Sequence, residues 1–221
     1  MTRESFDKQL RAMQDEVLVL GSMVDKAIDR SIESLKKRDL QEAQRIIEDD
    51  LKINQKRFDI EERALLLIAT QQPMASDLRF IAAALSIITD LERMADHAEG
   101  IAKLNLMLGE EPLIKPLIDI PRMAEKARDM LRRSLDALVA RDAEAAKIIA
   151  AEDDEIDVLY DQVYRELLTF MIQDPRTITR ATYLLWAAHN LERIGDRVTN
   201  ICERVVFTVT GKMVEMNVST Y

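Results

Sequence analysis

Apolar side chains recur every three or four residues along most of the chain, which is the spacing of helices that bury one face. In the first such stretch the apolar positions are Met13, Val17, Leu20, Val24, Ile28, Ile32 and Leu35. Asp39 is suited to be the N-cap of a second helix that runs to about residue 69, and Pro73 opens a third that runs to about residue 108. The pattern therefore predicts three long helices in the first half of the chain.

The second half of the chain repeats the first. At an offset of 103 residues, the recurring residues are Ser31, Leu35, Arg38, Asp39, Ala43, Ile46, Asp50, Ile53 and Leu65. At an offset of 100 residues, they are Leu85, Leu91, Glu92, Arg93, Asp96 and Ile101. The offset changes near Pro73 and Pro175, where a loop absorbs the difference. Two copies of one unit therefore make up most of the chain.

Short connections between long helices make neighbouring helices antiparallel. We therefore expect an all-α protein built from two tandem three-helix bundles. The expected division is a first unit over 1–108, a linker over 109–121, a second unit over 122–210 and a C-terminal tail over 211–221. In the second unit, Asp174-Pro175 is typical of an N-cap followed by proline at the first helical position.

Composition agrees with this fold and narrows the function. The chain holds only five glycines and five prolines in 221 residues, too few for the many turns of a β-rich fold. A formal net charge of −9 disfavours nucleic acid as a ligand, because such binding usually leaves a basic footprint. The single cysteine, Cys202, excludes an internal disulfide and suits a reducing compartment. Since no apolar run approaches the roughly 20 residues that span a bilayer and the first residues lack a signal-peptide core, we expect a soluble, cytoplasmic protein without a membrane span.

Acidic side chains form a stripe on the last helix of each unit. Its members are Glu92, Asp96 and, as a secondary candidate, Glu99 in the first unit, and Glu192, Asp196 and, as a secondary candidate, His189 in the second. At 3.6 residues per turn, each set falls within a sector of about 60°. The apolar residues of the same helices occupy another sector, so the stripe is expected to lie outside the core.

The middle helix of each unit carries a second polar pair at spacing four. The pairs are Asp50 with Asn54, and Asp153 with Asp157. Carboxylates four residues apart on a helix repel one another, and oxygen ligands suit hard or borderline divalent cations. Two facing stripes would therefore hold a divalent metal ion or a small multinuclear cluster of iron, zinc or another metal. The alternative is that these acids make ordinary surface ion pairs with the arginine inside each stripe.

Three segments carry information beyond this spacing. They are Glu192-Arg193-Ile194-Gly195-Asp196, Gln72-Pro73-Met74-Ala75-Ser76-Asp77-Leu78-Arg79 and Asn200-Ile201-Cys202-Glu203. Together with the internal repeat, they resemble the PhoU family of bacterial phosphate-signalling proteins, whose members carry two copies of a Glu-x-x-x-Asp signature, and the resemblance covers essentially the whole chain. The first copy departs from the second, since it has Ala95 in place of the glycine and Asn54 in place of an acid.

The resemblance implies a protein that is not an enzyme and acts as a negative regulator of phosphate uptake and of the phosphate-starvation response. The implied role is that of a cytoplasmic adaptor, and the implied partners are the ATPase component of a phosphate ABC transporter, a membrane sensor histidine kinase and a second copy of the chain in a homodimer. Some family members bind multinuclear metal clusters on the paired motifs. The alternative function is a carboxylate-bridged di-iron oxidase or metal-storage helical bundle, although that class uses Glu-x-x-His motifs, which the sequence lacks.

Overall fold

The computed structural model describes residues 3–216. Over this range the chain forms seven α-helices and one short 3₁₀ helix, and it contains no strand, which confirms the all-α prediction. The elements are α1 (Arg3–Lys37), α2 (Leu40–Gln71), α3 (Ala75–Leu108), α4 (Asp119–Ala140), α5 (Ala143–Ala151), α6 (Asp153–Gln173), η1 (Pro175–Thr177) and α7 (Ile178–Thr210). None of the helices in the described part of the chain is long and apolar enough to cross a membrane.

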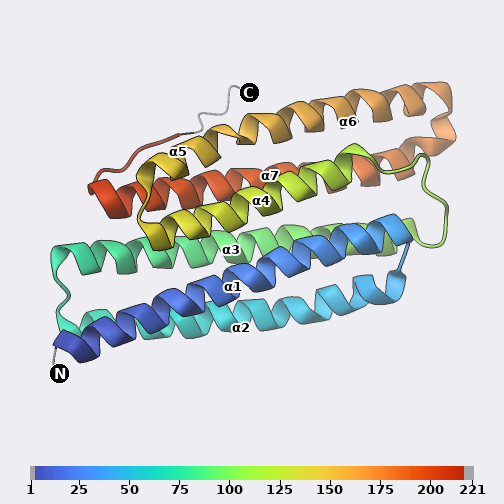
Figure 1. Cartoon of the computed structure of the whole chain (residues 1–221). Coiled ribbons are helices and arrows are strands. Elements are labelled where there is room, and N and C mark those ends of the chain that lie inside the picture. Colours follow the sequence, from blue (N-terminus) through green and yellow to red (C-terminus); the bar gives the residue numbers. More distant parts are fainter. Residues whose placement is uncertain (1–2, 217–221) are drawn as a thin grey trace.

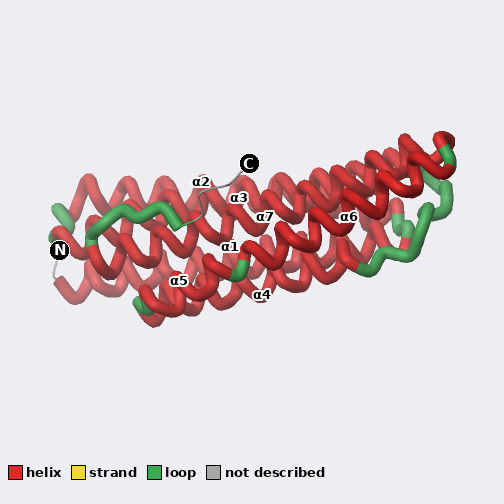
Figure 2. The backbone as a smooth tube through the Cα atoms, turned by 90° about the horizontal axis from the view of Figure 1, so that it is seen from above, coloured by secondary structure: helices red, strands yellow, loops and turns green. Residues whose placement is uncertain are grey.

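The helices form two three-helix bundles that lie side by side along one long axis. Figure 1 shows α1, α2 and α3 in the lower bundle, and α4, α5–α6 and α7 in the upper one. The antiparallel pair α3 and α7 makes the most extensive contact in the molecule, and α1 packs on α4 beside it. Seen from above, most of the loops gather at the two ends of the body (Figure 2). Tandem bundles were predicted from the repeat, whereas their lateral packing was not.

The predicted N-caps are confirmed. The Asp39 side chain accepts a hydrogen bond from a backbone N–H in the first turn of α2. Asp142, which is the counterpart of Asp39 at the repeat offset of 103, does the same at the start of α5. Asp174 also caps a helix start, with Pro175 directly after it. That start is the short helix η1, and α7 itself begins three residues after the proline, at Ile178. The cap was therefore placed correctly, and the long helix begins slightly later than predicted.

Two predicted boundaries were wrong. The middle helix of the second unit is broken at Glu152, whose carboxylate binds Arg133 and Lys126 of α4. No glycine or proline marks this break, so the periodicity alone pointed to one continuous helix. In addition, α4 begins at Asp119, inside the stretch expected to be linker, and includes Pro121 in its first turn. Proline is tolerated there because the first N–H groups of a helix have no partner within it.

The chain folds back after α7. Gly211 adopts a left-handed conformation with φ 73°, which glycine reaches without steric strain. The Met213 sulfur then accepts a hydrogen bond from the Arg204 guanidinium at 3.1 Å. The backbone N–H of Met216 donates a hydrogen bond to the Glu203 carboxylate at 2.8 Å. The first part of the expected tail is thus tied to α7, while residues 217–221 lie outside the described residues.

Polar side chains cross the contact between α3 and α7. Asp90 accepts hydrogen bonds from Arg197 and Asn200, each at 3.2 Å. The Nδ1 atom of His97 lies 2.9 Å from the side-chain oxygen of Asn190. At the repeat offset of 100, Asp90 corresponds to Asn190 and His97 to Arg197, so the two contacts are related by the duplication. The contact of Asp90 with Arg197 is ionic, and the contact of His97 with Asn190 is between an imidazole and an amide.

Candidate functional site

The polar pair on α2 faces the acidic stripe on α3. We call Asp50, Asn54, Glu92, Asp96 and Glu99 the first acidic cluster. Asp50 is only 8% exposed, and its pKa is raised to about 6, first by burial and then by the negative charges of Glu99, Asp96 and Glu92. Asp50 and Glu99 also line one cavity, so the polar pair on α2 and the acidic stripe on α3 lie on facing sides of it.

Two oxygen atoms in the first acidic cluster are buried without a hydrogen-bond donor. The Asn54 Nδ2 atom donates to one oxygen of the Asp50 carboxylate at 2.8 Å. The second oxygen, Asp50 Oδ1, and the Asn54 side-chain oxygen have no hydrogen-bond partner within residues 3–216. A buried acceptor without a donor is unfavourable by about 1–3 kcal/mol, so this position suits a bound cation or an ordered water molecule.

The carboxylates on α3 are partly neutralised by neighbouring cations. Arg93 lies 2.9 Å from Asp96 and 3.5 Å from Glu92, and Lys103 lies 2.6 Å from Glu99. The ion pairs considered as the alternative to a metal site therefore exist on this helix. None of these three ion pairs includes the buried carboxylate of Asp50 on α2.

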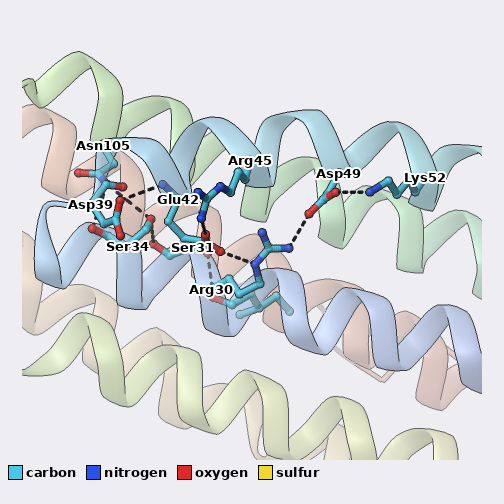
Figure 3. A network of polar contacts seen from close by, with 10 residues as sticks. Arg30, Ser31, Ser34, Asp39, Glu42, Arg45, Asp49, Lys52 and Asn105 are labelled. Carbon is cyan, nitrogen blue, oxygen red and sulfur yellow. Dashed lines mark hydrogen bonds and ion pairs between the residues drawn. The ribbon is translucent and has the colours of Figure 1, made fainter.

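Asp49, directly before Asp50 on α2, has the opposite electrostatic surroundings. Asp49 accepts hydrogen bonds from Arg30 of α1 at 2.8 Å and from Lys52 at 2.6 Å, and the same arginine also binds Glu42 (Figure 3). The pKa of Asp49 is lowered by these two cations, first by Lys52 and then by Arg30. Adjacent carboxylates thus differ in kind, since Asp49 is compensated by cations and Asp50 is not.

The second acidic cluster joins α6 to α7 and consists of Asp153, Asp157, Glu192 and Asp196, with His189 at its edge. Burial raises the pKa of Asp157, and the charges of Glu192 and Asp196 raise it further. Burial also raises the pKa of Asp196. The Nδ1 atom of His189 lies 3.4 Å from the Glu192 carboxylate. The predicted residues of the second unit are therefore close together as well.

Arg193 stands inside the second cluster as Arg93 does in the first. Its guanidinium lies 2.7 Å from Glu192 and 3.0 Å from Asp196. Among residues 3–216, no three His, Cys, Asp or Glu side chains are placed to ligate one metal ion as they stand. The donor set is chemically suited to a hard cation, but Arg193 and its counterpart would have to move for the carboxylates to converge.

The two clusters differ where alanine replaces glycine. A Cβ atom at Gly195 would lie 2.3 Å from Asp153 Oδ1 and 2.9 Å from Ile156 Cδ1, so α6 lies directly on α7 at this point. In the first unit Ala95 stands at the equivalent position, and a cavity of about 220 Å³ lies there, lined in part by Ala95 and Asp50. The spacing of the acids does not predict this cavity. The signal in the sequence that could have indicated it is Ala95 in the first copy of the motif, where the second copy has Gly195.

Comparison with known proteins agrees with the duplication. The family model described as PhoU domain matches the chain twice, over residues 17–104 and 120–205. A protein of Clostridium acetobutylicum named phosphate-specific transport system accessory protein PhoU homolog is 40% identical over 218 residues, which is 98% of this chain and all of that protein. A protein of Aquifex aeolicus with the same name is 38% identical and covers 94% of each chain.

Solved structures show the same arrangement of helices. The crystal structure of PhoU from Pseudomonas aeruginosa superimposes with a TM-score of 0.89 at 34% identity, over 94% of this chain and all of that one. The crystal structure of the phosphate transport system regulatory protein PhoU from Streptococcus pneumoniae gives a TM-score of 0.88 at 35% identity, over 95% of this chain and 99% of that one. The match therefore extends over both bundles and their packing.

Proposed function

Because the chain belongs to the PhoU family, we propose that it is a negative regulator of phosphate uptake and of the phosphate-starvation response, and that it performs no catalysis. The observation that carries this proposal is the near full-length similarity to proteins named as accessory to phosphate-specific transport. The similarity includes both repeats and the segment between them, so it concerns the whole regulatory protein and not a shared module.

The proposed mode of action is that of a cytoplasmic adaptor. One surface would contact the ATPase component of the phosphate ABC transporter, and another would contact a membrane sensor histidine kinase. Two bundles packed side by side expose long helical faces on opposite sides of the body (Figure 1), and such faces suit recognition by partner helices and loops. An adaptor of this kind transmits the state of the transporter by differential binding to its two states.

Deletion of the gene tests the regulatory role. In a strain that lacks the protein, a phosphate-starvation reporter should be active in high phosphate, and a plasmid copy of the gene should silence it again. Reporter activity that stays repressed in the deletion strain would contradict negative regulation. Co-purification of the protein with the transporter ATPase, compared in high and low phosphate, tests the adaptor role separately.

The second part of the proposal is that the acidic clusters bind divalent or multinuclear metal ions such as iron or zinc. The residues that would hold them are Asp50, Asn54, Glu92, Asp96 and Glu99 in the first cluster, and Asp153, Asp157, Glu192, Asp196 and His189 in the second. The support is the buried, donor-free oxygen of Asp50 together with the neighbouring carboxylates, whose negative charges raise the pKa of Asp50 in the first cluster and of Asp157 in the second. A bound cation would remove this repulsion and hold the two helices of each pair together.

Elemental analysis of protein purified without a metal-binding tag tests this part. The double substitution Glu192→Gln with Asp196→Asn should lower the metal content. Glu125→Gln with Asp129→Asn is the matched control, because these two acids have the same spacing on α4 but lie outside both clusters. Equal metal content in the two double variants would contradict a site at the second cluster.

The oxidase alternative has its own test. Iron-loaded protein, prepared without oxygen, is exposed to oxygen and followed by absorption spectroscopy. A regulatory metal site should show no catalytic turnover, and repeated oxygen-dependent oxidation would support the enzyme instead.

A further inference from the structure

The cavity beside Ala95 lies in the first unit, where α1, α2 and α3 meet. Its volume is about 220 Å³, which is room for about seven water-sized groups at about 30 Å³ each. Lys26 and Lys52 also line it and are exposed, so it opens to solvent on that side. Apolar side chains make up much of the remaining wall, namely Met23, Ala27, Ile46 and Ile53. The space is therefore larger than a single ion needs and fits a small organic molecule.

A buried carboxylate that lacks a donor lines this cavity. Asp50 is 8% exposed, and its Oδ1 atom has no hydrogen-bond partner within residues 3–216. The side-chain oxygen of Asn54 is also buried without a donor, while Asn54 Nδ2 donates to the other Asp50 oxygen at 2.8 Å. A primary ammonium group carries a positive charge and three N–H donors. One such group would therefore neutralise the carboxylate and donate to both oxygens.

The exposed side of the cavity carries a cation that also lacks a partner. The side chain of Lys26 makes no ion pair or hydrogen bond in the described part of the chain. The other two cations of the cavity, Arg30 and Lys52, are both bound to Asp49 (Figure 3). Lys26 and Asp50 line the same cavity without forming an ion pair with each other. The cavity therefore holds one uncompensated charge of each sign.

The second unit differs at the residues that make this space and its charge. At the repeat offset of 103, Ala27 corresponds to Met130, which is fully buried, and Lys26 corresponds to Asp129. In addition, α6 packs directly on Gly195. The same bundle therefore folds with a larger side chain and an acid at these two positions. Folding does not require the cavity or its cation, so they call for another explanation.

We propose that the cavity binds a short zwitterion, with a primary ammonium group at Asp50 and Asn54 and a carboxylate at Lys26. An aliphatic chain of about three to six carbon atoms between the two groups fits a cavity of this size. Each end of the ligand neutralises one uncompensated charge, so a zwitterion suits the cavity better than an amine or a carboxylate alone. The proposal does not depend on the regulatory role or on bound metal, and a metal ion on Asp50 would compete with the ligand.

Isothermal titration calorimetry of the full chain, with a chelator present, tests this proposal. The probes are β-alanine, γ-aminobutyrate and ε-aminocaproate, which differ in chain length. At least one of them should bind. The simple amine and the simple carboxylate of the same chain length each lack one charged end, and they should bind about tenfold more weakly or worse. Absence of binding by all three probes would overturn the proposal, and so would equal binding of the simple amine.

Two substitutions test the position of the ligand. Asp50→Asn removes the charge and keeps the shape, so it should lower the affinity for the probe by about tenfold or more. Asp59→Asn is the matched control, because it makes the same change at an exposed position of the same helix. Ala27→Met fills the cavity with the side chain that the second unit has at Met130, and it should abolish binding. Wild-type affinity in Asp50→Asn or in Ala27→Met would overturn the proposal, and melting curves separate lost binding from lost folding.

A third substitution distinguishes a bound ligand from an internal ion pair. If the carboxylate of the ligand binds Lys26, then Lys26→Gln should weaken binding of the zwitterion and leave binding of the simple amine unchanged. If Lys26 itself reaches Asp50 in solution, its removal should instead strengthen binding of the simple amine, and that result would overturn the proposal. These titrations use metal-free protein and no phosphate reporter, so their failure is distinct from failure of the proposed function.

Discussion

Replacing Gly195 with alanine tests the close approach of α6 to α7 at the second acidic cluster. The new Cβ atom would lie 2.3 Å from Asp153 Oδ1 and 2.9 Å from Ile156 Cδ1, both too close for atoms that are not bonded. Both neighbours are buried, at 1% and 0% exposure, and both belong to the first turn of α6. Both close atoms are the ends of side chains, so relief requires either that these buried side chains change rotamer or that the turn shift away from α7.

Two effects of opposite sign decide the outcome. Helix propensity alone predicts that alanine at a helical glycine stabilises the protein by about 1 kcal/mol. Overpacking of a filled contact is unfavourable by about 1–3 kcal/mol, and an approach as short as that at Gly195 belongs at the upper end. The expected net effect is a loss of about 1–2 kcal/mol in the free energy of unfolding, which is a fall of about 3–6 °C in melting temperature for a chain of this length.

Thermal unfolding followed by far-ultraviolet circular dichroism, with a chelator present, measures this loss. Ala95→Gly at the equivalent position is the control, and it should lower stability by about 1 kcal/mol through propensity alone. In the double variant Gly195→Ala with Asp153→Ala, the contact is relieved, so the combined loss should be smaller than the sum of the single losses. A Gly195→Ala protein that melts at or above the wild-type temperature would refute the reasoning.

Three further predictions concern burial and the contact between bundles. In metal-free protein, the native state holds the proton of Asp50 up to pH about 6, above the usual aspartate pKa of 3.8, so stability should fall as pH rises between these values, by on the order of 2–3 kcal/mol. Asp50→Asn should make this fall in urea midpoints smaller by the share that Asp50 contributes, and an unchanged profile would contradict the cause. Gly21→Ala would bring a Cβ atom 2.3 Å from Leu135 Cδ1 between α1 and α4, and should lower the melting temperature by a few degrees, an outcome that an unchanged melting curve would exclude. Arg197→Ala removes a donor from buried Asp90 and should lower the free energy of unfolding by about 1–3 kcal/mol in urea titrations, with Arg165→Ala on the surface of α6 as a control expected to change little.

Much of the candidate site was predictable because its geometry is local. Residues four apart on a helix share a face whatever surrounds the helix, so Glu192 and Asp196 could be paired from their spacing alone. The contact between His97 and Asn190 could not be found in this way, because the two residues are 93 positions apart and neither belongs to a periodic pattern. The break at Glu152 was missed for a related reason, since its partners lie on another helix.

The amino-acid sequence by itself determined the helices, their caps, the duplication of the unit and the alignment of acids into stripes. These features depend on backbone hydrogen bonding and on a period of 3.6 residues, both of which act within a few turns of one helix. The tertiary structure alone decided that Asp49 is matched by cations while Asp50 is left with a buried, donor-free oxygen. It also decided that α6 closes on Gly195 while a cavity remains beside Ala95. Burial and electrostatic balance depend on which helices pack together, and that packing joins residues far apart in the chain.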